Sequence, residues 1–251
     1  MGIIGKIVGG TIGFALGGPL GAVFGAVFGH AFDTENTALQ ENSRPEPSML
    51  EESQLAFFVG TFSMLAKLAK ADGRVGQEEI DTIESFAVND LGLTPASRDV
   101  AFNIFRAALN SPANFEDFAL QFYGHFRNQP QMIEMMIDIL LRVAAADGAI
   151  HLAEETLILS AARIFHFDQN RLSQLKSRYM ASSDKYYDLL GCSRQDSDET
   201  IKRHYRHLVQ TYHPDKIAGK GLPDEFTQLA QDKFREIQEA YETIKKERKM
   251  N

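Results

Sequence analysis

The sequence contains no tryptophan, only one cysteine (Cys192) and only eight prolines among 251 residues. A single cysteine excludes an intrachain disulfide and a cysteine metal cluster, which suits a reducing compartment. The chain also lacks the Ser/His/Asp and Cys/His signatures of nucleophilic enzymes. We therefore expect a protein that is not an enzyme and carries no cofactor of its own.

An excess of basic charge is also missing. The formal net charge is −8. Residues 184–251 carry 13 basic and 13 acidic side chains, so the acidic excess lies in residues 1–183. Proteins that bind nucleic acid neutralise phosphates with a surplus of Lys and Arg, so nucleic acid is not an expected partner.

Charge is absent altogether between Lys6 and Asp33, where 26 residues include eight glycines and fifteen apolar residues. At about 1.5 Å per residue, a helix of this length spans a hydrocarbon core of about 30 Å, and lipid forces the backbone to form its own hydrogen bonds. We expect residues 1–32 to form one transmembrane helix, kinked at Pro19. A cleaved signal peptide and a glycine-rich soluble or peripheral segment are the alternatives.

Glycines recur at every fourth position of this segment. Residues four apart share one side of a helix, so the stripe forms a groove without side chains, in which two helices can approach closely. The pattern predicts a homodimer through the membrane helix, with an oligomeric pore as a further alternative. The stripe consists of Gly5, Gly9, Gly13, Gly17, Gly21, Gly25 and Gly29.

The middle of the chain follows a polar segment, residues 33–49, which contains Pro45 and Pro47 and is typical of a linker. In residues 50–180, apolar residues recur at three- and four-residue spacing, which predicts a helical domain. The tripeptide Ala-Asp-Gly occurs twice in it, at residues 71–73 and 146–148. The domain therefore consists of two related halves, each with a helix, a turn closed by glycine and a second helix.

The acidic residues of the two halves have two interpretations. In the first, each glycine adopts a left-handed conformation at a helix end, and the acids cap the helix that follows. In the second, the acids of both halves meet and bind a divalent cation through oxygen. The four candidate ligands are Asp72, Glu79, Asp147 and Glu154.

The two halves resemble the TerB-like domain, an all-helical module named for tellurite-resistance proteins. The resemblance covers about residues 50–175. It implies an all-helical fold in which acidic positions have been linked to metal binding, but not tellurite as a ligand.

Residues 184–251 predict a short helix closed by Gly191 and then a hairpin of two longer helices. The first long helix runs from Ser197 to about Tyr212 and separates an apolar face from a basic one. Pro214 must end this helix and leave its two neighbours exposed in a loop. The apolar positions predicted to face inward are Ile201, Tyr205, Leu208, Tyr212, Phe226, Leu229, Ala230, Phe234, Ile237, Tyr241 and Ile244.

Four motifs in order, YYDLLG (186–191), IKRHYRHL (201–208), YHPDK (212–216) and KFREIQEAY (233–241), resemble the J-domain of DnaJ-type co-chaperones. The resemblance implies docking on the ATPase domain of a DnaK-class chaperone and stimulation of its ATP hydrolysis. His207 stands where Arg or Lys is usual, which predicts pH-sensitive docking. The positions that match the partner-binding residues are Lys202, Arg203, Arg206, His213, Pro214, Asp215 and Lys216.

Taken together, the three parts resemble the membrane-anchored DnaJ-like co-chaperones of Gram-negative bacteria. This implies an all-α, single-pass protein of the inner membrane, with a short periplasmic N-terminus and most of the chain in the cytoplasm. The expected function is regulatory: it recruits and stimulates the DnaK-class partner. The alternative is a metal- or stress-sensing membrane scaffold that acts through the TerB-like domain.

Overall fold

The computed structural model describes residues 17–33, 48–179 and 184–250, which form helices and no strand. The expected all-α class is confirmed. A five-residue π-helix (Phe86–Asp90) follows α4, and a 3-10 turn (Asp224–Phe226) precedes α13. The α-helices are α2 (Gly18–Asp33), α3 (Met49–Leu68), α4 (Gln77–Ser85), α5 (Pro95–Asn110), α6 (Phe115–Phe126), α7 (Pro130–Ala144), α8 (Leu152–Ile164), α9 (Gln169–Ser177), α10 (Lys185–Leu190), α11 (Asp198–Tyr212), α12 (Pro214–Ala218) and α13 (Thr227–Arg248).

Helix α3 is the centre of the middle domain, residues 48–179. It begins at a capping box, in which the backbone N–H of Glu51 donates to Ser48 Oγ (3.3 Å) and that of Ser48 donates to Glu51 Oε2 (3.0 Å). From Leu55 onward almost every side chain of α3 is buried, because α2, α5, α6 and α7 all pack around it. A helix that is apolar all round must be enclosed in this way.

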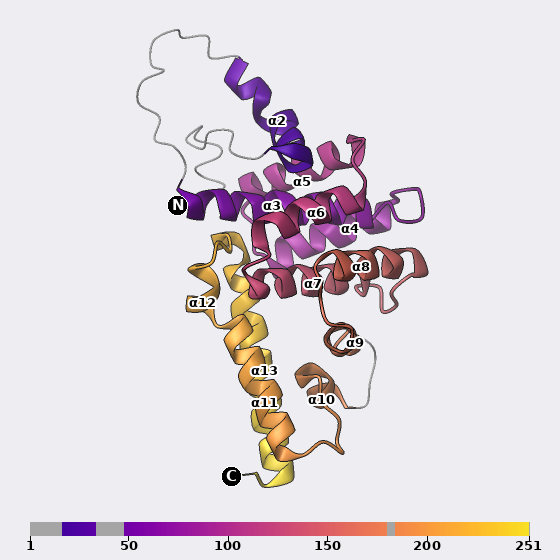
Figure 1. The fold of residues 1–251 in the computed structure, drawn as a ribbon. Coiled ribbons are helices and arrows are strands. Elements are labelled where there is room, and N and C mark those ends of the chain that lie inside the picture. The colour runs from indigo at the N-terminus through magenta and orange to yellow at the C-terminus, as the bar shows by residue number, and fades with distance from the viewer. Residues whose placement is uncertain (1–16, 34–47, 180–183, 251) are drawn as a thin grey trace.

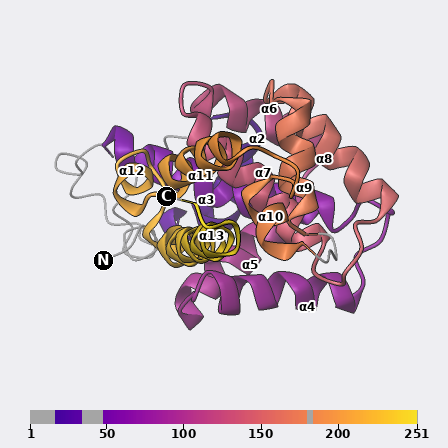
Figure 2. The ribbon, with the colours of Figure 1, turned by 90° about the horizontal axis from the view of Figure 1, so that it is seen from below.

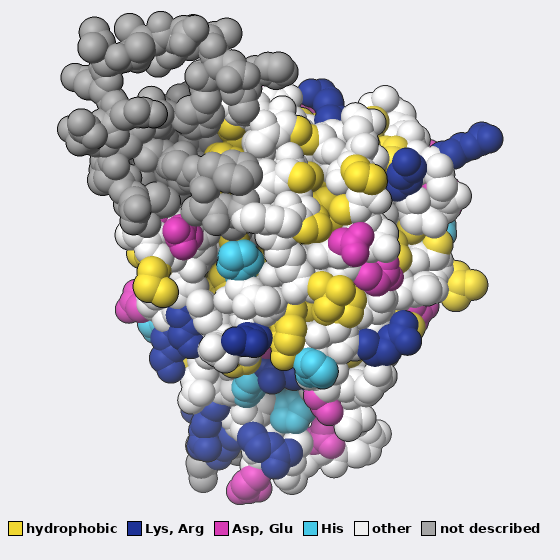
Figure 3. All heavy atoms as spheres, turned by 45° about the horizontal axis from the view of Figure 1, so that its top comes forward, with side chains coloured by type: hydrophobic (Ala, Val, Ile, Leu, Met, Phe, Trp, Pro, Cys, Tyr) yellow, Lys and Arg dark blue, Asp and Glu magenta, His cyan; other side chains and the backbone are white. Residues whose placement is uncertain are grey.

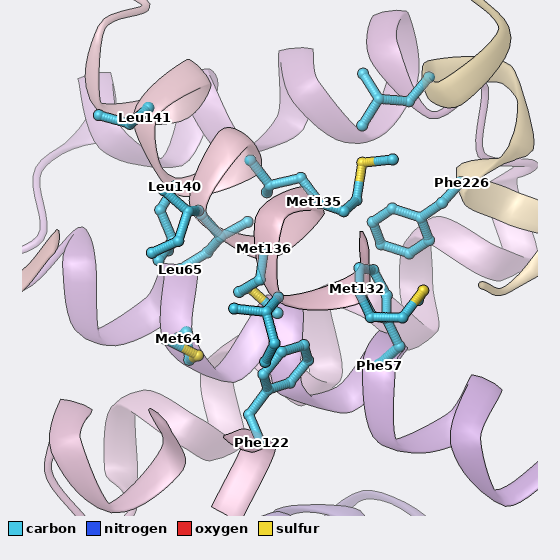
Figure 4. Close-up of a cluster of buried hydrophobic side chains, with 14 of the residues drawn as sticks. Phe57, Met64, Leu65, Phe122, Met132, Met135, Met136, Leu140, Leu141 and Phe226 are labelled. Carbon is cyan, nitrogen blue, oxygen red and sulfur yellow. The ribbon is translucent and has the colours of Figure 1, made fainter. Parts of the chain in front are cut away.

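The methionine and phenylalanine side chains fill the space between α3, α6 and α7 (Figure 4). Phe57 of α3 contacts the ring of Phe126 in α6 edge to face, with ring centroids 5.8 Å apart. Met132 and Met136 of α7 are fully buried, Met132 near Phe57 and Met136 near Phe122 (Figure 4). The apolar stripes of the sequence therefore form the core.

The two halves of the middle domain have matching turns. Gly73 and Gly148 adopt φ values of +96° and +95°, a conformation that glycine favours. In each turn an aspartate accepts a hydrogen bond from the backbone two residues later, at 3.0 Å for Asp72 and 3.1 Å for Asp147. The repeat seen in the sequence is thus a repeat of local structure.

The C-terminal domain, residues 184–250, lies below the middle domain in Figure 1, with α11 and α13 side by side as a hairpin (Figures 1 and 2). Tyr205 of α11 stacks on Tyr241 of α13, with centroids 3.9 Å apart and planes 7° from parallel. The expected hairpin is therefore present.

Two details of this hairpin differ from the expectation. Pro214 does end α11, but it also starts the short helix α12, because its fixed φ suits the first turn of a helix. Phe226, expected to face α11, points into the middle domain instead, where its ring lies edge-on to Phe57 at 5.1 Å and to Phe58 at 6.1 Å. The periodicity of α13 does not extend back to Phe226, because Phe226 belongs to the 3-10 turn that precedes this helix.

Helix α2 covers part of the middle domain and contacts α3, α5 and α6. It contains residues of the expected membrane segment, of which residues 1–16 lie outside the described part of the chain. Pro19, where a kink was expected, lies in the first turn of α2, so its missing N–H breaks no hydrogen bond within this helix. Among the described residues no helix has the length and apolarity required to cross a bilayer.

Candidate functional site

The basic face of α11 is open to solvent, as its sequence predicts. Arg203 and Arg206 are exposed and Lys202 is half-buried, whereas Ile201 and Leu208 on the opposite face are buried. Lysine, arginine and histidine side chains gather over the lower end of the molecule in Figure 3, where this domain lies. This face of α11 therefore presents positive charge to solvent.

The His213-Pro214-Asp215 tripeptide lies next to this face, at the junction of α11 and α12. The carbonyl oxygen of His213 accepts hydrogen bonds from the backbone N–H groups of Lys216 (3.0 Å) and Ile217 (3.1 Å), which fixes the turn. Asp215 and Lys216 are exposed. The imidazole of His213 is only half-exposed and lies edge-on to the ring of Phe234, at 5.5 Å between centroids.

A cluster of buried charges, which the sequence patterns did not predict, lies between the two domains. Glu134 and Asp138 of α7 are only 1% and 3% exposed, and Lys233 of α13 is 4% exposed. Arg171 and Arg178 reach the two carboxylates from α9 and its C-terminal end. The signal in the sequence is the pair of acids four residues apart inside the apolar run of α7.

The centre of this charged cluster is Asp138. The hydroxyl of Tyr179 donates to its Oδ1 at 2.7 Å, and Arg178 Nη1 lies 3.9 Å from the same oxygen. Lys233 Nζ lies 3.8 Å from Oδ2 and donates to the Tyr179 hydroxyl at 3.1 Å. Burial lowers the pKa of Lys233 and raises the pKa values of Glu134 and Tyr179. Each charged group depends on its partners, because an unpaired buried charge is costly.

His207 lies at the edge of the charged cluster and contacts Arg171, while its Nε2 is 3.5 Å from Glu134 Oε2. Burial, followed by the charges of Arg171 and Arg178, lowers its pKa from 6.5 to about 4. His207 is therefore neutral near neutral pH. Any change in the charge of His207 therefore occurs at a lower pH than for an ordinary histidine.

Residues 219–226, here called the docking segment, attach the C-terminal domain to the N-terminal half of α3. The amide of Gln54 donates to the carbonyl oxygen of Leu222 at 3.3 Å, and Phe226 enters the aromatic cluster. Gly221, with φ of +89°, is so close to α3 that a Cβ added to it would lie 2.5 Å from Ser53 Cβ. Only glycine fits this position without a shift.

The four candidate metal ligands all lie at the repeated turns, where their carboxylates accept backbone hydrogen bonds. Glu79 Oε2 caps Gly76 N (2.8 Å), and Glu154 Oε2 caps His151 N (3.1 Å). Burial is the main reason that the pKa of Glu154 is raised, and the charges of Asp147 and Glu79 add to it. Within residues 17–33, 48–179 and 184–250, no group of three or more His, Cys, Asp or Glu side chains could hold a metal ion.

The glycine stripe is described only in part, since Gly5, Gly9 and Gly13 lie outside the described residues. Gly21 is buried under the contact of α2 with the middle domain, and Gly25 is half-buried. The carbonyl oxygen of Gly17 accepts a hydrogen bond from the side chain of Gln121. Gly29 lies within α2.

Comparison with known families divides the chain into the same three parts. The model of the co-chaperone DjlA transmembrane domain matches residues 1–46, that of the tellurite resistance protein TerB matches residues 58–177, and that of the DnaJ domain matches residues 185–251. The co-chaperone protein DjlA of Shewanella oneidensis is 30% identical to the chain, over 77% of this chain and 79% of the relative. The chain belongs to the DjlA co-chaperone family.

Other members of the family are similarly related. The co-chaperone protein DjlA of Coxiella burnetii is 30% identical, over 83% of each chain, and that of Escherichia coli K12 is 30% identical, over 78% of this chain and 81% of the relative. No solved structure is a significant match. The C-terminal domain is thus a J-domain and the middle domain is TerB-like, and the transmembrane match indicates a membrane-anchored protein.

A substitution at Gly221 tests the attachment of the J-domain. We expect Gly221→Ala to lower the free energy of unfolding by about 1–3 kcal/mol, because the new Cβ meets Ser53 and the backbone becomes strained. The matched control is Gly219→Ala, since Gly219 is exposed and its φ of −69° suits any residue. Urea unfolding measures both, and equal effects of the two substitutions would contradict the close contact.

A low pH should weaken the attachment of the J-domain to the TerB-like domain, because it protonates His207. Its folded pKa of about 4 lies below the ordinary 6.5, so between these values the unfolded chain binds more protons and stability falls as the pH falls. The groups that face His207 are Arg171 and Arg178 from the α9 side, Glu134 from α7, and His204 and Thr211 from α11.

Urea unfolding at pH 7.5 and pH 5 tests this dependence. We expect the wild type to lose more stability than His207→Gln between the two pH values, because glutamine binds no proton. His151→Gln, at an exposed histidine of the middle domain, is the control for removal of any histidine. Parallel losses in the wild type and His207→Gln would refute the role of His207.

Proposed function

We propose that the chain is a regulatory co-chaperone that docks on a DnaK-class chaperone through its J-domain and stimulates ATP hydrolysis by that partner. The observation that carries the proposal is the exposure of Arg203 and Arg206 on α11 and of Asp215 and Lys216 at the start of α12, in a J-domain. In this mechanism the chain needs no catalytic centre or cofactor, because the partner performs the chemistry.

The two parts of this surface contribute differently. The arginines of α11 attract an acidic surface, which raises the rate of encounter and fixes the orientation more than it adds affinity. The turn at Pro214 is rigid, because the His213 carbonyl and the first turn of α12 hold it. It presents the Asp215 carboxylate to a cation on the partner.

The proposed location follows from the partner. A DnaK-class chaperone and its ATP are cytoplasmic, so the J-domain and the TerB-like domain are assigned to the cytoplasmic side of the inner membrane. The N-terminal segment would cross the membrane once, leaving a short periplasmic end. Its glycine stripe, Gly5 to Gly29, would pair two chains through close helix contact.

Single-turnover ATP hydrolysis by purified DnaK, with the full chain added, tests the proposal. We expect the wild type to stimulate hydrolysis and His213→Gln to leave it at the basal rate, with both proteins folded by circular dichroism. Arg206→Ala should require several-fold more protein for half-maximal stimulation, and its response should depend less on salt.

Arg74→Ala is the matched control for Arg206→Ala, because Arg74 is also exposed but lies in the TerB-like domain. It should stimulate hydrolysis as the wild type does. A wild-type chain that leaves the DnaK rate unchanged at every concentration would refute the function. Full stimulation by His213→Gln would refute the assignment of the site.

A further inference from the structure

The surface of the TerB-like domain that α2 covers, formed by α3, α5 and α6, binds a helix in a specific way. It is called the α2-binding surface below. Leu20, Val23 and Phe24 are 0–2% exposed against it. Their spacing of i, i+3 and i+4 places these three large side chains on one face of α2. Proteins that bind an amphipathic or apolar helix in a surface groove contact side chains at this spacing.

Gln121 of α6 recognises the backbone of the bound helix. Its Oε1 accepts from the N–H of Leu20 at 2.8 Å, and its Nε2 donates to the carbonyl oxygen of Gly17. The first N–H groups of a helix lack partners within the helix, so the amide satisfies one of them. Because both contacts are to backbone atoms, they do not depend on the side chains of the bound segment.

At the N-terminal end of α2, the position of Gly18 requires a small residue. A Cβ added to Gly18 would lie 3.0 Å from Gln121 Oε1, and the φ of Gly18 is +61°. The α2-binding surface therefore selects a segment with a small first residue, followed by large apolar residues at the spacing of Leu20, Val23 and Phe24.

The same residues lie within the segment that matches the family's transmembrane domain, residues 1–46. Leu20, Val23 and Phe24 cannot be buried against α3, α5 and α6 and face lipid at the same time. Insertion of this segment into a bilayer therefore empties the α2-binding surface. An exposed apolar surface of this kind on a soluble domain marks a binding site.

We propose that the α2-binding surface is a binding site for apolar helical segments of other proteins, and that α2 occupies it when the segment is outside the membrane. The occupant is a helix with apolar side chains at i, i+3 and i+4, of the kind that unassembled membrane proteins expose. The site goes beyond the docking of a DnaK-class partner, because it would let the chain hold a client while its J-domain acts.

The test uses the full chain and a fluorescent peptide with the sequence of residues 17–28, GGPLGAVFGAVF, extended by lysines for solubility. Leu20→Asp combined with Phe24→Asp empties the site in solution. Fluorescence anisotropy should show saturable binding to this emptied variant, at least tenfold tighter than to the wild type, whose own α2 competes. A peptide with the same two aspartates should not bind.

Two further variants test the geometry within the emptied background. Gln121→Ala should weaken peptide binding about tenfold, because both backbone contacts are lost. The matched control, Asn128→Ala, removes an exposed amide just after α6 and should leave binding unchanged. The wild type reconstituted in liposomes should bind the peptide as the emptied variant does, because its α2 is then in the bilayer.

Several results would overturn the proposal. A folded emptied variant that does not bind the peptide would do so, as would equal binding by the wild type and the emptied variant. Liposome-bound wild type that ignores the peptide would also overturn it. If light scattering instead shows the wild type as a dimer in which crosslinks join α2 of one copy to α6 of the other, the occupant is a second copy of the chain.

Discussion

The charges buried between α7, α9 and α13 hold the two folded domains in one arrangement. Asp138 has Tyr179, Arg178 and Lys233 around it, and these groups come from both sides of the domain boundary. Removing one partner would leave the remaining charges buried without an opposite charge. The free-energy cost of such an unpaired charge exceeds the net stabilisation that the complete ion pair provides. The J-domain therefore contacts the TerB-like domain through these buried charges in the arrangement that the structure shows.

This arrangement determines what the molecule presents to its surroundings. The charged cluster and the docking segment face the TerB-like domain, so Arg203 and Asp215 are directed toward solvent. His207 lies at the boundary, and the charges of Arg171 and Arg178 together with burial keep it neutral. On another part of the TerB-like domain, α2 covers a surface that an apolar helix fits. The proposed docking face of the J-domain and the proposed α2-binding surface thus lie on two domains that contact each other.

The sequence predicted the features that depend on local chemistry. Periodicity and capping depend on residues that are neighbours in the sequence. They predicted the glycine turns at Gly73 and Gly148, the apolar and basic faces of α11, and the end of this helix at Tyr212. Periodicity does not predict contacts between distant segments. Three features depend on such contacts: the burial of Phe226 in the middle domain, the packing of α2 on the TerB-like domain, and the charged cluster. Glu134 and Asp138, two acids inside an apolar stripe, were the one visible sign of the cluster.

Differential scanning calorimetry of the full chain tests most directly whether the charged cluster joins the domains. If it does, the TerB-like domain and the J-domain unfold together, in one transition whose calorimetric and van't Hoff enthalpies agree. Two separate transitions, with the J-domain melting alone while the TerB-like domain stays folded, would contradict the account.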